Sequence, residues 1–382
     1  MTTSKLDLWF KSYNEKSLSH RYITHEMIVP LIQNLGANFK VDVVGHSVKN
    51  IPIETITFGN GPTKILMWSQ MHGNESTTTK ALFDVLNTLI MEPSLNPFFD
   101  ELTVCIVPML NPDGAFAYTR VNANQFDLNR DAQELTQPES KILRQVYNSF
   151  KPDYCFNLHG QRTIFGAGKT GNSAVVSFLA PAQDEQLTVT NTRKTAMEII
   201  VQLNIKLKAD LPNQIGLYDD AFNINCVGDT FQSFNTPTVL VEAGHIREDY
   251  PRDITRKYIF KTLLLAFDYL KSGVVIKNET VEQYQSIPLN EKCFFDVIIR
   301  NARIEDGSKQ VDIAFQFAEV LQNGKIVFKP KVEKIGDLSE FFGHKEINAK
   351  GNLVKTNTNK TIYEGYENVL VLINNEKIPV ML

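Results

Sequence analysis

Apolar residues follow two alternating patterns along this chain, and together these patterns predict most of its regular structure. Short apolar runs typical of buried strands alternate with longer segments in which apolar residues return every three or four positions, as on one face of a helix. In the first two thirds of the chain, strands are expected at 64–68, 102–109, 154–159, 178–180 and 239–241, and helices at 76–90, 138–150, 190–207 and 254–270. This alternation predicts an α/β fold with a mixed, largely parallel sheet flanked by helices.

The region before this alternation has a different pattern. Residues 15–36 carry apolar side chains at the spacing of a single amphipathic helix. Residues 39–44 and 51–58 alternate between apolar and polar positions, so we expect them to pair as antiparallel edge strands.

Beyond Lys271-Ser272-Gly273 the helical period fades and the pattern becomes that of a β-rich domain. Short strands are expected at 294–299, 311–317, 326–332 and 369–373. Asn323-Gly324 is a strong hairpin-turn signal between two of them. The chain therefore divides into a larger domain at 1–275 and a small β-rich domain at 280–382. The small domain carries no chemical constellation, so we expect it to pack on the larger one; shaping substrate access or a subunit contact is the alternative.

Composition narrows the class of protein. The 382 residues are 43% hydrophobic and 21% charged, as in ordinary globular proteins. The net charge of −4 implies no broad basic surface for nucleic acid or an anionic membrane. No run of 18 apolar residues is present, so no membrane span is expected. The start of the chain lacks the apolar segment of a signal peptide and the four cysteines are not closely paired, which together favour a cytoplasmic protein with free thiols.

The first candidate for chemistry lies where the strand at 64–68 gives way to the helix at about Ser76. His72 and Glu75 stand three residues apart in this junction. Open α/β sheets place their ligands at such strand ends. An imidazole nitrogen and a carboxylate oxygen are both good zinc ligands. The pair alone is a weak signal, because this spacing also occurs in proteins without a metal.

A second histidine, His159, ends the strand at 154–159 and is followed by Gly160. By itself it could be an ordinary core histidine before a glycine turn. Catalytic zinc usually takes three protein ligands and keeps one position for water. Because His159 occupies a strand end equivalent to that of His72 and Glu75, the three together favour a metal site.

The segment between these motifs contains polar residues that a plain loop does not explain. Asn111-Pro112-Asp113-Gly114 is a turn signature after the strand at 102–109. Arg120, Asn129 and Arg130 follow in a mostly uncharged stretch. The planar guanidinium of arginine suits carboxylates and oxyanions. Solvated loop arginines are the alternative interpretation.

A further carboxylate, Glu242, ends the β-branched run that begins at Thr236. A carboxylate at the tip of a buried strand is costly unless it has a partner or a task. Beside a zinc-bound water that task would be general base.

Taken in order, these residues resemble the M14 family of zinc carboxypeptidases over roughly residues 15–265. The resemblance rests on His72, Glu75, Asn111 to Gly114, Arg120, Asn129, Arg130, His159 and Glu242. It implies one zinc ion per chain, held by His72, Glu75 and His159.

The resemblance also implies roles for the remaining residues. Glu242 would be the general base, and Arg120 would polarise the scissile carbonyl. Asn129 and Arg130 would hold the terminal carboxylate of the substrate. Asp127 would support the first zinc histidine, which makes physical sense because a metal-bound imidazole needs its other N–H fixed.

Three other residues fit the family less directly. The family has a mobile substrate-binding tyrosine some twenty residues before the glutamate, and Tyr218 lies 24 residues before Glu242. Asp229 falls near the positions that line the side-chain pocket; it could bind a substrate ammonium, but an ordinary turn aspartate is the favoured interpretation. For His245 a supporting or structural role is favoured over that of a fourth ligand.

The resulting prediction is a zinc metallocarboxypeptidase that hydrolyses an amide bond next to a free carboxylate, with a peptide or acyl-amino acid as substrate. An acyl-amino-acid deacylase is one alternative, because His-Gly-Asn-Glu also occurs in the aspartoacylase and succinylglutamate desuccinylase group. A murein-peptide amidase of the same fold is another. A catalytically dead peptide-binding protein is disfavoured because His72, Glu75, His159 and Glu242 are all present. The sequence determines neither side-chain preference nor oligomeric state.

Overall fold

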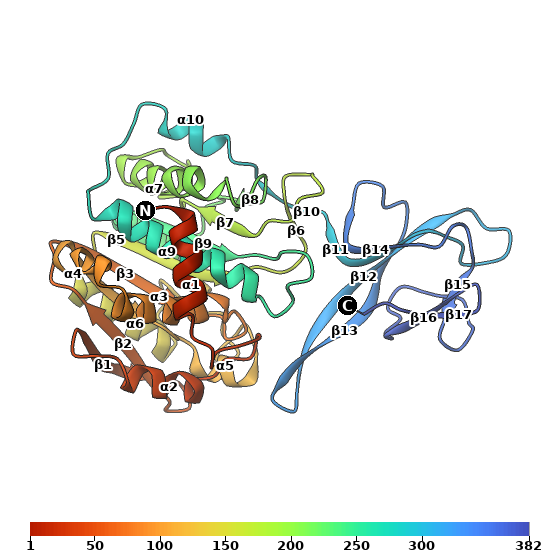
Figure 1. Cartoon of the computed structure of the whole chain (residues 1–382), viewed down its shortest axis with the longest axis horizontal. Coiled ribbons are helices and arrows are strands. Elements are labelled where there is room, and N and C mark those ends of the chain that lie inside the picture. The colour runs from red at the N-terminus through yellow and green to blue at the C-terminus, as the bar shows by residue number, and fades with distance from the viewer. Residues whose placement is uncertain (382) are drawn as a thin grey trace.

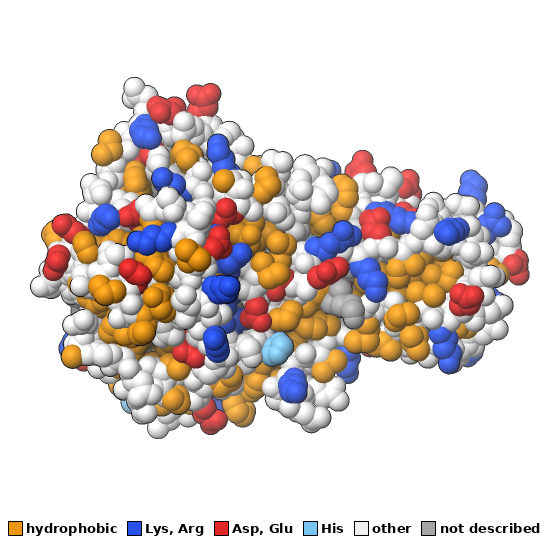
Figure 2. All heavy atoms as spheres, in the orientation of Figure 1, with side chains coloured by type: hydrophobic (Ala, Val, Ile, Leu, Met, Phe, Trp, Pro, Cys, Tyr) orange, Lys and Arg blue, Asp and Glu red, His pale blue; other side chains and the backbone are white. Residues whose placement is uncertain are grey.

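The computed structural model describes residues 1–381 and consists of two parts of different architecture (Figure 1). The larger part is an eight-stranded sheet covered by helices, and the smaller part, which follows it in the chain, is made of β-strands. Figure 2 shows acidic and basic side chains mixed over one face of both parts. Within residues 1–381, no helix combines the length and apolar character needed to cross a bilayer.

The large sheet has the strand order β1-β2-β4-β3-β5-β9-β7-β8. Its strands are β1 (Phe39–His46), β2 (Pro52–Phe58), β3 (Thr63–Ser69), β4 (Leu102–Val107), β5 (Tyr154–Gly160), β7 (Val176–Leu179), β8 (Ile215–Leu217) and β9 (Thr238–Ala243). The central strands β4, β3, β5 and β9 run parallel, whereas β1 pairs antiparallel with β2 at one edge. The prediction of a mixed, largely parallel sheet with an antiparallel pair at 39–58 is confirmed.

Helices cover both faces of this sheet. One face carries α1 (Thr3–Tyr13), α2 (His25–Gln33), α3 (Thr77–Met91), α4 (Pro97–Glu101), α7 (Asn191–Leu207) and α9 (Asp253–Leu270). The other carries α6 (Pro138–Phe150) and α8 (Val227–Ser233). Short elements complete this part of the chain: η1 (Pro93–Leu95), α5 (Pro112–Ala117) and η2 (Leu128–Arg130).

Alternating side chains of the central strands build the two cores. In β3, Ile65 and Met67 join the core under α3 and α9, whereas Leu66 and Trp68 join the core under α6 and α8. This follows from the two-residue period of a strand. Because both faces are buried, these strands are continuous apolar runs.

The structure differs from two local predictions. The helix expected over 15–36 covers only His25–Gln33, and a separate helix, α1, precedes it. Leu18 and Ile23 are buried outside any helix, so their spacing reflects packing into the core. Asn111 to Gly114 is likewise more than a turn: Asn111 caps α5, and its side-chain oxygen accepts a hydrogen bond from the Gly114 N–H at 2.8 Å.

The smaller part contains two sheets. The four-stranded sheet has the order β13-β12-β11-β14. Its strands are β11 (Phe294–Ala302), β12 (Val311–Gln322), β13 (Lys325–Gly336) and β14 (Phe342–Asn348). The three-stranded sheet is formed by β15 (Val354–Thr356), β16 (Leu370–Ile373) and β17 (Glu376–Pro379). Asn323 and Gly324 connect β12 to β13 with φ of 52° and 72°, so the predicted hairpin turn is confirmed.

The chain passes between the two parts through two short elements. α10 (Thr280–Gln285) packs on α7, and β10 (Asn290–Lys292) pairs with β6 (Phe165–Ala167). The long hairpin of β12 and β13 reaches back from the smaller part toward the α5 region (Figure 1). The two parts therefore meet on the side of the large sheet where β3 and β5 end.

Candidate metal centre

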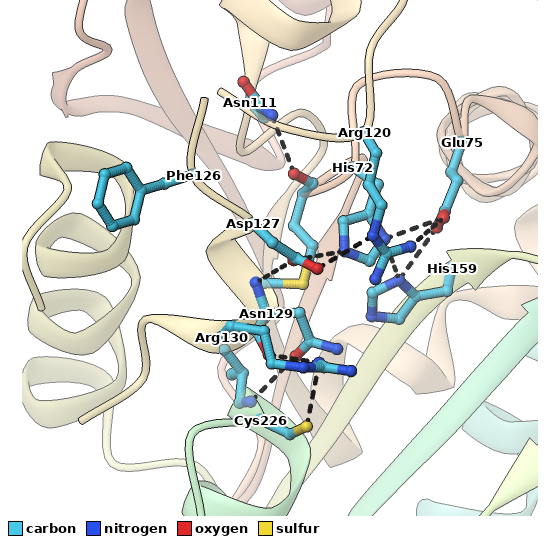
Figure 3. A network of polar contacts seen from close by, with 12 residues as sticks. His72, Glu75, Asn111, Arg120, Phe126, Asp127, Asn129, Arg130, His159 and Cys226 are labelled. Atoms are coloured by element: carbon cyan, nitrogen blue, oxygen red, sulfur yellow. Dashed lines mark hydrogen bonds and ion pairs between the residues drawn. The ribbon is translucent and has the colours of Figure 1, made fainter. Parts of the chain in front are cut away.

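Three side chains of types that can bind a metal converge at the carboxyl ends of β3 and β5 (Figure 3). His72 Nδ1 lies 2.9 Å from Glu75 Oε1, and His159 Nδ1 lies 3.0 Å from Glu75 Oε2. The two imidazole Nδ1 atoms are 3.1 Å apart. All three residues are largely shielded from solvent. The structure thus brings together the three ligands predicted from the sequence.

Local backbone structure explains this convergence. β3 and β5 are adjacent and parallel, so their carboxyl ends meet at one edge of the sheet. The Asn111 side chain donates to the Met71 carbonyl at 3.1 Å and holds the loop that carries His72. A Cβ atom on Gly73 would lie 1.9 Å from the backbone of Gly114, so the loop can approach α5 this closely only with glycine at position 73.

Asp127 determines which nitrogen of His72 faces the cluster. The Asp127 carboxylate lies 3.0 Å from His72 Nε2, so Nε2 carries the proton of the neutral ring and Nδ1 points its lone pair toward Glu75. Burial alone would raise the pKa of Glu75, but the adjacent histidines hold it well below its usual range. A carboxylate and two imidazole nitrogens converging in this way can together bind one cation. The donor set fits zinc.

Glu242 lies next to this cluster without being one of its ligands. It is on β9, directly opposite His159 of β5. Its side chain is buried, and its Oε2 has no hydrogen-bond partner among residues 1–381. Burial, with the nearby charge of Glu75, raises the pKa of Glu242 well above its usual value. In its ionised form this carboxylate could take a proton from a water molecule in the cavity.

Arg120 lies at the rim of the cluster. Its Nε donates to Asp127 Oδ2 at 3.0 Å, and its Nη1 is 3.4 Å from Glu75 Oε1. The side chain is 47% exposed, so part of the guanidinium faces the cavity. It can therefore reach an oxygen of a molecule bound beside the three ligands.

Asn129 and Arg130 line the same cavity and belong to η2. Asp127 caps this short helix by accepting from the Asn129 N–H at 2.9 Å. Asn129 Oδ1 accepts from the Val227 N–H at 3.0 Å. Arg130 donates to the Asn129 carbonyl at 2.7 Å and lies 3.1 Å from Cys226 Sγ. Within the described part of the chain Arg130 has no acidic partner, so its charge is available to an anion.

The cavity that these residues share has a volume of about 530 Å³ and also contains Tyr218 and Asp229. Tyr218 follows β8 and packs on Phe165, with ring centroids 5.4 Å apart. Burial, with the charge of Glu242, raises its pKa, so the hydroxyl keeps its proton. Asp229 is in the first turn of α8 and not in a turn between elements, and burial raises its pKa to about 6.

His245 lies outside this cavity. It is buried between Tyr250 and His344, with ring centroids 4.6 and 4.5 Å away. Burial lowers its pKa well below the usual value, so the ring is neutral. The structural role expected for His245 agrees with this position.

Other residues that line the cavity were not predicted. Asn157 is two residues before His159 on β5, so the alternation of a strand would have placed it on the same face. Arg162 follows the end of the same strand and lines the rim. Cys226 had no sequence signal, because it precedes α8 and reaches Arg130 only through the fold.

The chain is similar to known peptidases over parts of its length. Residues 27–174 match the Peptidase M14 family model, which describes zinc carboxypeptidases. A probable carboxypeptidase 2 of Arthroderma benhamiae is 27% identical over 110 residues, which are 28% of this chain and 20% of that protein. A gamma-D-glutamyl-L-diamino acid endopeptidase 1 of Lysinibacillus sphaericus is 36% identical over 80 residues, 19% of this chain and 20% of that protein. The matches thus span about a fifth of the length of these relatives.

Among solved structures, a metallo-carboxypeptidase from Burkholderia cenocepacia is similar with a TM-score of 0.52 and 18% identity. The similarity covers 65% of this chain and 68% of that one. At this identity the likeness shows a shared fold.

Proposed function

We propose that this chain, an M14 zinc carboxypeptidase-like protein, hydrolyses the amide bond next to the free carboxylate terminus of a peptide. One observation carries the proposal. A single cavity holds three converging metal donors, a buried carboxyl without a partner, and an arginine without an acidic partner among residues 1–381. These are the groups that a metal-assisted exopeptidase needs.

His72, Glu75 and His159 would hold one zinc ion per chain. Zinc, when bound, lowers the pKa of a coordinated water from 15.7 to about 7 and polarises a carbonyl. Glu242 would accept the proton that the attacking water loses and deliver it to the departing amine, so the carboxylate is regenerated in each cycle. The position of Glu242 beside the three donors and its Oε2, unpaired within residues 1–381, support this role.

Arg120 and Arg130 would bind different groups of the substrate. Arg120 would donate to the carbonyl oxygen as negative charge develops on it, and one such donor contributes about 3 kcal/mol to barrier lowering. Arg130, with the Asn129 amide, would bind the terminal carboxylate. The bond nearest the terminus then lies beside the metal ligands.

A peptide library tests this proposal. Each peptide is supplied with a free or an amidated carboxyl end, and products are identified by mass spectrometry. Loss of single residues from free carboxyl ends supports the proposal. Internal cleavage, or equal cleavage of both forms, contradicts it.

A second candidate is an amidase acting on a peptide that ends in a diamino acid. The observation that favours it is Asp229, a carboxyl on the wall of the cavity that could bind a second ammonium group. The relative named for gamma-D-glutamyl-diamino acid cleavage is 36% identical to this chain over 80 residues. Faster release of a terminal diamino acid than of a terminal neutral residue would distinguish this candidate. An acyl-amino-acid deacylase would instead prefer single acylated amino acids.

A further inference from the structure

A second cavity lies beside the metal ligands, and both parts of the chain form its walls. Its volume is about 380 Å³. One wall is the segment Phe317 to Glu319 of β12, from the β-rich part. The facing wall includes Glu75, Arg120 and Arg162, which also line the first cavity. The two cavities therefore adjoin at the metal cluster.

The residues that line each cavity indicate which side of the scissile bond it would bind. Asn129 and Arg130 line the first cavity but not the second. A substrate with its terminal carboxylate at Arg130 has its scissile carbonyl near Arg120. The portion on the acyl side of that carbonyl then leads away from Arg130, into the second cavity.

The wall contributed by the β-rich part is firmly held. Glu319 accepts from the Tyr118 hydroxyl at 2.5 Å and pairs with Arg21 at 2.9 Å. The N–H of Phe317 donates to the buried carboxylate of Asp296 at 2.6 Å. These bonds cross between the two parts or anchor the strand, so Phe317 to Glu319 is a fixed wall of the cavity.

Of the three arginines that line the second cavity, two form ion pairs with described residues and one does not. Arg21 is paired with Glu319, and Arg120 with Asp127. Arg162 is exposed, and within residues 1–381 it forms no ion pair. Its guanidinium can bind a carboxylate with two parallel hydrogen bonds.

We propose that this second cavity is a subsite, built jointly with the β-rich part, for an acidic residue on the acyl side of the scissile bond. Arg162 binds the acidic group, and Phe317 to Glu319 limit the space around it. The inference rests on the proposed function for the orientation of the substrate. It assigns the β-rich part a direct role in substrate selection.

The test uses two probes, acetyl-Glu-Ala and acetyl-Gln-Ala, which differ only in the charge at the proposed subsite. Binding to the Glu242→Gln variant of the full chain is measured by calorimetry, and hydrolysis by the wild-type chain as kcat/KM. We expect about a tenfold preference for the acidic probe in both, since a charge-assisted hydrogen bond is worth that much or more. Arg162→Gln should remove the preference, whereas Arg303→Gln, an exposed arginine of the β-rich part outside both cavities, should keep it.

A second variant tests the wall. Ala318 is exposed on the cavity side of β12, and Ala318→Trp should fill the space and lower binding and kcat/KM of both probes at least tenfold. Gln322→Trp, on the same strand but outside the lining, is the matched control. An unchanged preference in Arg162→Gln, or an Ala318→Trp variant that behaves like its control, overturns the subsite.

The two measurements separate the subsite from the proposed function. Binding that depends on Arg162 and Ala318, without hydrolysis, supports the subsite and contradicts the proposed hydrolysis. Hydrolysis without these dependences contradicts the subsite alone. A chain that neither binds nor hydrolyses the two probes contradicts both.

Discussion

The carboxylate of Asp127 lies 3.0 Å from His72 Nε2 and thereby turns His72 Nδ1 toward Glu75 and His159. The same carboxylate accepts from Arg120 through its other oxygen. One residue thus orients a candidate metal ligand and places the arginine beside it. The predictions below follow from this arrangement and from the groups around it.

The first prediction concerns Asp127 itself. Asp127→Asn removes the charge that fixes the His72 ring, and loss of such a partner typically weakens metal binding about 10-fold to 100-fold. Competition with a chromogenic zinc chelator measures the affinity. Asp337→Asn, an exposed aspartate of the β-rich part, is the control. An unchanged affinity in Asp127→Asn would show that Asp127 does not support the site.

The second prediction concerns Glu242. Glu242→Gln keeps the size of the side chain but cannot accept a proton, so turnover should fall by at least about 100-fold. Zinc content should stay at the wild-type level because Glu242 is not among the three converging donors. Metal analysis and kinetics on the same preparation check both statements. Near-normal turnover in this variant rules out Glu242 as the base.

The third prediction separates Arg130 from Arg120. Arg130→Ala should slow cleavage of a free-carboxylate peptide about 10-fold to 100-fold, the worth of a charge-assisted hydrogen bond of about 1.5 to 3 kcal/mol. Arg120→Ala should act on the carbonyl oxygen, so it should lower kcat for every peptide that the wild type cleaves. Kinetics on a set of free-carboxylate peptides and on their amidated forms distinguishes the two. If Arg130→Ala retains full discrimination between these forms, carboxylate binding lies elsewhere.

The fourth prediction concerns stability and pH at Lys80, which is buried in α3 and donates to Asp253 at 2.8 Å. Burial lowers the pKa of Lys80 from 10.5 to about 8. Between these values the unfolded chain binds more protons at this site than the folded chain, so the contribution of Lys80 to the free energy of unfolding rises with pH. The full rise is on the order of 3 kcal/mol.

Chemical unfolding of wild type and Lys80→Met between pH 8 and pH 10.5 measures this rise. The stability of the wild type relative to the variant should increase with pH. Lys309→Met, at an exposed lysine, should show no such change. A difference that stays constant across this range would mean that Lys80 titrates as an ordinary lysine.

The sequence was most informative where local pattern and tertiary structure agree. The helix expected at 138–150 is α6 with the same bounds, because its proline at N1 and its amphipathic spacing are both local signals. α1 was missed because only Leu6 and Trp9 of its residues are buried, which leaves little period to detect. Short helices of this kind depend on packing against their neighbours.

The site was predictable to the extent that its residues lie at strand ends. His72, Glu75, His159 and Glu242 stand where the apolar runs of β3, β5 and β9 end, and the structure places them together. The wall that Glu319 forms in the second cavity could not be predicted from the sequence. Its partner Tyr118 is 201 residues away in the chain, and no local pattern connects the two.

The most direct test of the central claim is the position of the metal. Crystals of the full chain grown with one equivalent of zinc, with diffraction recorded at the zinc absorption edge, locate the ion by its anomalous signal. We expect one peak, about 2.0 to 2.2 Å from His72 Nδ1, His159 Nδ1 and a Glu75 oxygen. An anomalous map without a peak among these three side chains would contradict the zinc site and the hydrolysis proposed from it.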